Sequence, residues 1–184
     1  GLFNDSKKFT KFVCSPNVTN IGYRAFQASG LRDFYPSELT KLKTLSEGVF
    51  RACGSLTNNF DLSQSELTYV PPFAFADLVK VKSIKFPKTL TELASESIGY
   101  NKSSRAVWFM GPPPAMDSDA LNPKGGDPWV LVGALNYVNE WKTNENLIPF
   151  SSADEKAQAY AAIKKFNLSG VVPVGKWKYQ TGGY

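Results

Sequence analysis

Apolar residues recur along this chain in a pattern whose period is a little over twenty residues. In the clearest copy, Phe75 is preceded by apolar residues five and eight positions earlier and followed by others nine and eleven positions later. We call the residue in the position of Phe75 the anchor of its copy. The anchors are separated by 23, 24, 25, 23 and 23 residues, and they are Phe3, Phe26, Phe50, Phe75, Ile98 and Leu121. A constant period of this length is typical of a solenoid, in which each copy forms one coil.

The second half of each copy alternates between apolar and polar residues, as a short strand does. In the fourth copy, Ile84 and Phe86 share one face of the expected strand, while Lys85 points to the other face. The third copy has one additional residue, which places Phe60 and Leu62 one position later than in the other copies and predicts a bulge. The predicted strands are residues 9–14, 31–35, 56–62, 81–86, 105–109 and 129–132.

The first half of each copy is too short for a long helix and predicts a single turn or a 3₁₀ turn that ends at the anchor. One coil cannot bury its own apolar face, so we expect neighbouring coils to stack their anchors into one continuous core. Phe3 has only the second half of a copy around it. The N-terminal coil is therefore expected to be incomplete, with its apolar end open or covered by a neighbour.

Residues 134–184 break the period, and we expect them to cover the C-terminal end of the coils. The segment 134–143 has Leu135, Val138 and Trp141 on one side of a predicted helix. Ser152 and Glu155 form a capping box before a second helix over residues 156–166. The expected apolar stripe of this helix consists of Ala157, Tyr160, Ala161 and Ile163. Asn167 is its expected stop.

Residues 171–179 predict a strand, and Pro173 places it at a sheet edge because proline cannot donate a ladder hydrogen bond. The chain is thus expected to divide into a solenoid at residues 1–133 and a cap region at residues 134–184, with two helices and an edge strand.

Several segments resemble the leucine-rich repeats of the BspA-like class. They include VTNIGYRAF (18–26), CGSLTNNFDL (53–62) and LTYVPPFAFADLVKVKSIKFP (67–87), and the resemblance extends over about residues 9–142. The cysteine of that pattern is matched by Cys53, its glycine by Gly22, and its strand-ending proline by Pro87 and loosely by Pro36. The resemblance implies a β-rich α/β fold, a right-handed leucine-rich-repeat solenoid of about five to six short coils with a C-terminal α+β cap. It also implies a bacterial cell-surface or secreted protein used in adhesion or partner binding.

The net charge of +5 and the pI of about 9.1 are mild for 184 residues, and the 21 basic residues are spread along the chain. Nucleic-acid binding proteins usually concentrate such residues on one face, so a nucleic-acid partner is not expected. The chain has no apolar run of about 18 residues, and direct membrane insertion is not expected. Its first residues lack the basic and apolar regions of a signal peptide.

The chain contains no histidine, which excludes Ser-His-Asp and Cys-His catalysis and histidine-based zinc sites. Cys14 and Cys53 lie two coils apart, about 10 Å, which is too far for a disulfide, so both are expected to be buried free thiols. Asp117, Asp119 and Asp127 lack the spacing of a calcium loop, and no metal or cofactor is expected.

The outward position of each strand predicts a binding surface. The residues in this position are Val13, Tyr35, Phe60, Lys85, Trp108 and Leu131. A solvated row should be mostly polar, whereas this one is mostly apolar or aromatic, as interaction sites are. The basic residues beside the row are Arg32, Lys82 and Arg105, which would attract acidic partners. The alternative is that the tail covers the row, for example through Trp177 or Tyr179.

Three functions remain open on the sequence. The first is a non-catalytic binding or adhesion module that presents the strand face to a protein or a glycan. The second is a structural spacer without a ligand of its own. The third is a carbohydrate-active enzyme, since two facing carboxylates need only meet in space. We expect the first of these, and the pattern leaves the oligomeric state open.

Overall fold

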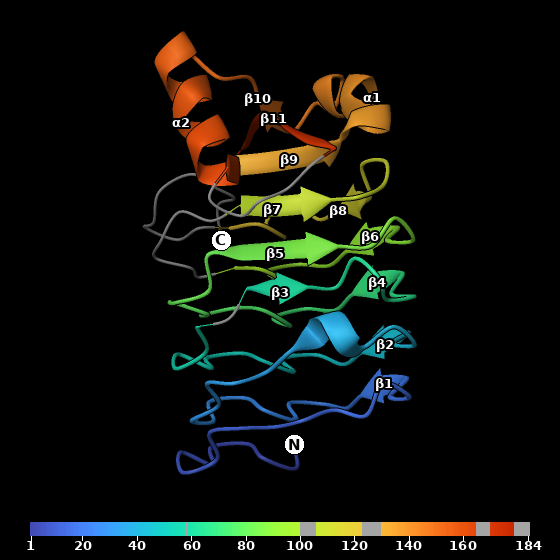
Figure 1. Cartoon of the computed structure of the whole chain (residues 1–184), viewed down its shortest axis with the longest axis vertical. Coiled ribbons are helices and arrows are strands. Elements are labelled where there is room, and N and C mark those ends of the chain that lie inside the picture. Colours follow the sequence, from blue (N-terminus) through green and yellow to red (C-terminus); the bar gives the residue numbers. More distant parts are fainter. Residues whose placement is uncertain (58, 100–105, 123–129, 165–169, 179–184) are drawn as a thin grey trace.

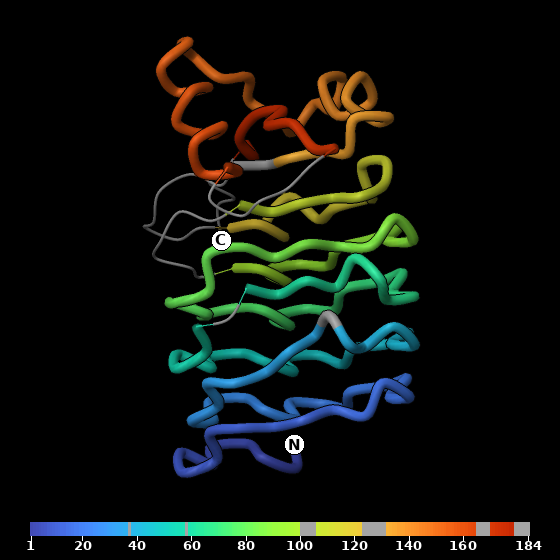
Figure 2. The backbone as a smooth tube through the Cα atoms, viewed as in Figure 1, coloured from blue at the N-terminus to red at the C-terminus, as the bar shows by residue number. Residues whose placement is uncertain are grey.

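A computed structural model of the chain describes residues 1–57, 59–99, 106–122, 130–164 and 170–178. These residues form a stack of coils that rises from the N-terminal end to a small helical cap (Figures 1 and 2). The expected solenoid with a C-terminal cap is confirmed. Within this part of the chain, the helices are all too short or too polar to span a bilayer.

One side of the stack is a six-stranded sheet with the order β10-β11-β9-β7-β5-β3. Its parallel strands come one from each successive coil and are β3 (Phe60–Asp61), β5 (Ser83–Phe86), β7 (Ala106–Phe109) and β9 (Val130–Ala134). The cap adds two antiparallel strands, β11 (Val171–Trp177) and β10 (Leu147–Ile148). The predicted strands at 9–14 and 31–35 form only one bridge, between Lys11 and Asp33.

The strand β11 lies between β10 and β9, so the prediction that it is an edge strand is wrong. Pro173 is tolerated because β10 pairs only with Lys176 and Trp177, at the far end of β11. The register between β11 and β9 also shifts between Pro173 and Gly175, so the ladder needs no N–H group at Pro173.

A second side of the coils carries strands of only two residues. β1 (Asn20–Ile21) pairs with β2 (Thr44–Leu45), and a three-stranded sheet contains β4 (Tyr69–Val70), β6 (Glu92–Leu93) and β8 (Ala115–Met116). The sequence analysis did not predict these strands, because alternation cannot be recognised over two residues. The second residue of each strand is the apolar position five residues before an anchor.

The third side is a tight turn that carries the anchor and binds the next coil through the main chain. The amide of Phe26 donates to the carbonyl of Val49 at 2.9 Å, and the amide of Phe50 donates to the carbonyl of Ala74 at 3.0 Å. The turns repeat a positive φ at equivalent positions, which are Arg24, Gly48, Phe73 and Glu96. The repeat therefore conserves a backbone shape even where the residue is not the glycine that this shape favours.

The anchors form the buried ladder that the period predicts. Phe26, Phe50, Phe75, Ile98 and Leu121 are all buried. The rings of Phe26 and Phe50 stack with centroids 5.4 Å apart, and those of Phe50 and Phe75 stack at 5.8 Å. The anchors from Phe26 to Phe75 thus form one aromatic column, which the rings of Phe86 and Phe109 extend toward the cap.

The cap begins with the 3₁₀ helix η2 (Leu135–Tyr137) and helix α1 (Val138–Lys142), which together occupy the first predicted helix. Trp141 is buried as predicted, whereas Leu135 is exposed. A further 3₁₀ helix, η1 (Pro36–Glu38), interrupts the second coil and was not predicted.

Helix α2 (Ala153–Lys164) begins three residues before its predicted start. The Ser152 hydroxyl accepts a hydrogen bond from the amide of Glu155 at 3.1 Å, which confirms Ser152 as the capping residue. The predicted apolar stripe is wrong for Ala157, Tyr160 and Ala161, which are exposed. Only Ala159 and Ile163 are buried, because the helix touches the sheet along a narrow line near its C-terminal end. The predicted stop, Asn167, lies outside the described residues.

Candidate binding surface

The outer face of the six-stranded sheet places one outward residue of each coil in a row. Strand pairing joins Asp61 to Lys85, Lys85 to Trp108, and Trp108 to Val132. The bridge between Lys11 and Asp33 aligns the first two coils, and Val13 and Tyr35 each lie two residues further along their segments, in the position equivalent to Asp61. The row predicted from the pattern therefore exists, with two of its members replaced.

Phe60 is a correction to the predicted row, because it pairs with Ile84 and points into the core. It is buried, and its ring meets that of Phe75 edge-on at 5.2 Å. The additional residue of the third coil shifts the strand by one position, and a shift of one reverses the face of every side chain. Asp61 occupies the outward position instead, a change that the late positions of Phe60 and Leu62 could have indicated.

Leu131 is a second correction of the same kind. It pairs with Val107, whose side chain belongs to the core, and so occupies the register of an inward residue. Its neighbour Val132 pairs with Trp108 and takes the outward position. The spacing from anchor to strand is one residue longer in this last coil than in the two coils before it, and this difference reversed the assignment.

The C-terminal half of the outer face is covered by the cap. Trp108 is completely buried in a small cluster that also contains Val132, Ile163 of α2 and Val171 of β11. Trp108 is therefore not an exposed binding residue, and the alternative that the tail covers the row is correct for this half. The cover is Ile163 and Val171, whereas Trp177 packs into the main core and Tyr179 lies outside the described residues.

The N-terminal half of the outer face is open. Tyr35 is 53% exposed and Val13 is 70% exposed. Lys85 and Asp61 form a partly buried ion pair whose Nζ and Oδ2 atoms are 3.5 Å apart. We name this area the N-terminal sheet face and define it by Val13, Arg32, Tyr35, Asp61, Lys82 and Lys85. Arg32 and Lys82 are exposed as predicted, and the remaining predicted residue, Arg105, lies outside the described residues.

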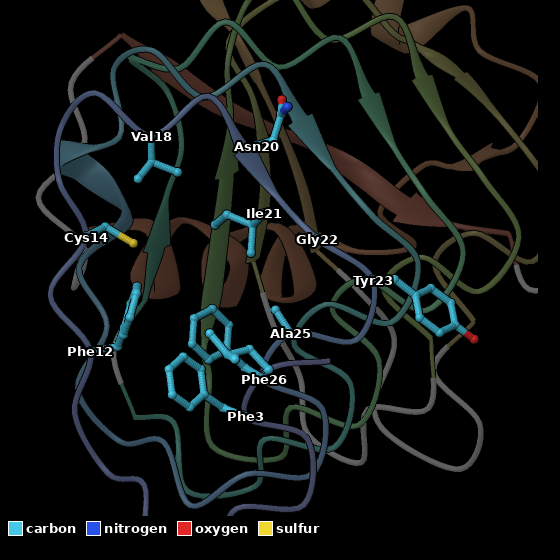
Figure 3. Close-up of a pocket in the computed structure, with 11 residues that line it drawn as sticks. Phe3, Phe12, Cys14, Val18, Asn20, Ile21, Gly22, Tyr23, Ala25 and Phe26 are labelled. Carbon is cyan, nitrogen blue, oxygen red and sulfur yellow. The ribbon is translucent and has the colours of Figure 1, made fainter.

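The N-terminal end of the core carries a hollow. An apolar hollow of about 280 Å³ lies there, and Phe3, Phe12 and Phe26 point toward one another on its floor (Figure 3). Leu2 at its rim is 84% exposed. The rings of Phe3 and Phe26 stack at 5.7 Å, so the aromatic column of the core continues into this end.

Both cysteines are free, which confirms that they do not form a disulfide. Cys53 is buried and donates a hydrogen bond to the carbonyl of Phe26 at 2.8 Å, so it ties two coils together. Cys14 is only half-buried, contrary to expectation, because it lies beside the open N-terminal hollow. Burial raises the pKa of each thiol to about 11, and the negative charge of Glu38 contributes for Cys14.

The folded protein should therefore resist thiol alkylation. A pKa of about 11 in place of 9.0 lowers the reactive thiolate fraction at pH 8 by about 100-fold. Mass spectrometry after iodoacetamide treatment should find both cysteines unmodified in buffer and both modified in denaturing urea. Labelling of native Cys14 at the rate of a small-molecule thiol would contradict the pKa shift.

The carboxylates predicted to lack a calcium pattern have structural partners. Asp117 accepts a hydrogen bond from the amide of Ser95 at 2.7 Å, and Asp119 accepts one from the hydroxyl of Ser95 at 2.9 Å. The third of them, Asp127, lies outside the described residues. In the described ranges, no group of three or more His, Cys, Asp or Glu side chains is placed to hold a metal ion.

Comparison with family models matches residues 1–105 to a BspA type leucine rich repeat region, in six copies. This match covers more than half of the 184 residues and includes the anchors from Phe3 to Ile98. No curated protein and no solved structure matches the chain.

Proposed function

We propose, from the premise that this chain belongs to the BspA-type leucine-rich-repeat family, that it is a non-catalytic binding and adhesion module. In this proposal it is part of a bacterial cell-surface or secreted protein and presents its N-terminal sheet face to a protein or glycan partner. The observation that supports the proposal is the division of the outer face, of which the cap covers one half and leaves the other open.

Tyr35 is the centre of the proposed contact. A tyrosine that is 53% exposed beside the exposed Val13 offers apolar area together with a hydroxyl, and tyrosine is a frequent hot-spot residue at interfaces. The adjacent pair of Lys85 and Asp61 is held in place by its own ion pair and by partial burial. The face thus combines an aromatic contact with polar groups that need little ordering when a partner binds.

The charge of the N-terminal sheet face favours an acidic partner. Arg32 and Lys82 are exposed, while Asp61 is balanced by Lys85. The excess of positive charge agrees in sign with the net charge of +5 for the whole chain. Such a surface attracts acidic groups over about 10 Å at an ionic strength of about 0.1 M, and binding should weaken as more salt is added.

The spacer hypothesis predicts a uniformly polar outer face, and the exposure of Tyr35 and Val13 disfavours it. The enzyme hypothesis requires two facing carboxylates in a cleft. Asp117 and Asp119, two neighbouring carboxylates on one coil, instead bond to Ser95 of the preceding coil.

Replacing Tyr35 by alanine should reduce partner binding at least about tenfold, because it removes the only large aromatic side chain of the N-terminal sheet face. The full chain and the variant would be applied to an array of extracellular-matrix proteins and glycans, and the affinity of each hit would then be measured by biolayer interferometry. Tyr160→Ala is the matched control, because Tyr160 is a tyrosine of similar exposure, 45%, on the cap.

Equal affinity of the Tyr35→Ala variant and the unchanged chain for every hit would remove the N-terminal sheet face from the proposal. An array on which the chain binds nothing would support the hypothesis that it is a structural spacer.

A further inference from the structure

A hollow of about 460 Å³ with a mixed polar and apolar lining adjoins the N-terminal sheet face, where the chain turns after β3, β5 and β7. Its main lining residues are Gln64, Glu66, Lys85, Lys88, Thr89 and Met110. Lys85 belongs both to the hollow and to the N-terminal sheet face, so the two are continuous. Hollows of this volume are typical of small-molecule sites.

Hydrogen bonds from side-chain hydroxyls to main-chain carbonyls hold the walls of the hollow in shape. The Ser65 hydroxyl donates to the carbonyl of Leu62 at 2.8 Å, and the Thr89 hydroxyl donates to the carbonyl of Leu67 at 2.8 Å. Gly111 allows the turn after β7 to approach closely, since a Cβ at this position would lie 2.6 Å from the carbonyl oxygen of Lys88. A ligand would therefore meet a cavity that needs little reorganisation.

The charges that line the hollow leave one cation without a counter-charge. Lys85 is paired with Asp61 at 3.5 Å, and Glu66 is paired with Lys43 at 3.4 Å. Lys88 and Gln64 are exposed and make no ion pair or side-chain hydrogen bond with the described residues. The hollow thus offers one ammonium group for an anion, and an amide that can both donate and accept.

We propose that this hollow binds a saccharide unit that carries a carboxylate, such as a uronic acid at the end of a glycan. The carboxylate contacts Lys88, the ring hydroxyls bond to Gln64, Glu66 and Thr89, and the carbon face of the sugar packs on Met110. This inference rests on the proposed function, because it names the ligand class for the same side of the molecule.

The mixture of lining groups favours a sugar acid over an acidic peptide. A sugar hydroxyl both donates and accepts, and the hollow has donors in Gln64 and Lys85 and acceptors in Gln64 and Glu66. A peptide rich in carboxylates would need cations alone, and Glu66 would repel its second charge.

The test titrates the full chain with D-glucuronic acid, D-glucose and a tetraglutamate peptide, and follows binding by saturation-transfer NMR. Saturable binding of glucuronic acid is expected, at least about tenfold tighter than that of glucose. Lys88→Gln should lower the affinity for glucuronic acid about tenfold, to the level of glucose, while Lys80→Gln should leave it unchanged. Lys80 is the matched control because it is an exposed lysine in the turn before β5, outside the hollow.

Equal affinity for glucose and glucuronic acid, or tighter binding of tetraglutamate, would overturn the assignment of a sugar acid. So would an unchanged affinity for glucuronic acid in Lys88→Gln. Any of these results, together with a partner that still depends on Tyr35, would reject this inference and leave the proposed function in place. If glucuronic acid does not bind as expected and partner binding does not depend on Tyr35, both this inference and the proposed function would be rejected.

Discussion

The Phe75→Ala variant should unfold with a free energy about 3–5 kcal/mol lower than that of the unchanged chain, as is usual for a buried phenylalanine. Phe75 is completely buried at the centre of the aromatic column. Its ring stacks on Phe50 at 5.8 Å and meets the edges of Phe60 at 5.2 Å and Phe86 at 6.1 Å. Alanine would leave a cavity that the rings of Phe50, Phe60 and Phe86 cannot fill without moving the coils.

Guanidinium denaturation followed by circular dichroism would measure this loss. Tyr35→Ala serves as the control, because Tyr35 is exposed and its removal should change stability by less than about 0.5 kcal/mol. Phe75→Leu should fall between the two, since leucine fills part of the cavity. A Phe75→Ala variant as stable as the control would mean that the column does not hold the coils together.

Trp141→Ala should cost a similar amount, about 3–5 kcal/mol, and should loosen the cap as a unit. Trp141 is completely buried, and its ring lies 4.7 Å from that of Phe109, the last phenylalanine of the column. Its indole N–H donates to the carbonyl of Gly111 at 3.3 Å. Its removal would therefore uncover the end of the column and leave this carbonyl without the indole donor.

Hydrogen exchange with mass spectrometry would separate the loss of the cap from the loss of the whole fold. In Trp141→Ala, peptides from α1, β10 and β11 should exchange faster than those from β3 and β5, because the coils below keep their own contacts. Leu135→Ala is the control, since Leu135 lies three residues before α1 and is exposed. Uniform exchange along the whole variant would contradict a separable cap.

The sequence alone was sufficient to identify the repeat and the residues of its buried core. A period of 23–25 residues identified all the buried anchors from Phe26 to Leu121, because every coil must place one side chain at the same position around the axis, where it stacks on that of the next coil. The capping role of Ser152 was also readable, since a cap depends on residues three or four apart. The absence of a disulfide followed from the spacing of coils.

In the irregular coils, the sequence could not determine which strand residues occupy inward positions and which occupy outward positions. Phe60 and Leu131 were placed outward, whereas β3 and β9 pair both with inward positions of the neighbouring strands. One residue more in the turn before a strand exchanges its two faces, and only the pairing with the neighbouring strand shows whether the turn or the strand has taken up that residue.

The extent of the open surface was decided by the tertiary structure alone. Tyr35 and Trp108 occupy equivalent positions in the repeat, yet one is exposed and the other is buried under Ile163 and Val171. Ile163 lies 55 residues after Trp108, and no local pattern records that the two meet. The repeat period determines which residues form a row because it acts through neighbouring coils. How much of that row remains open depends on where a non-repeating tail packs, which is a contact between segments distant in the chain.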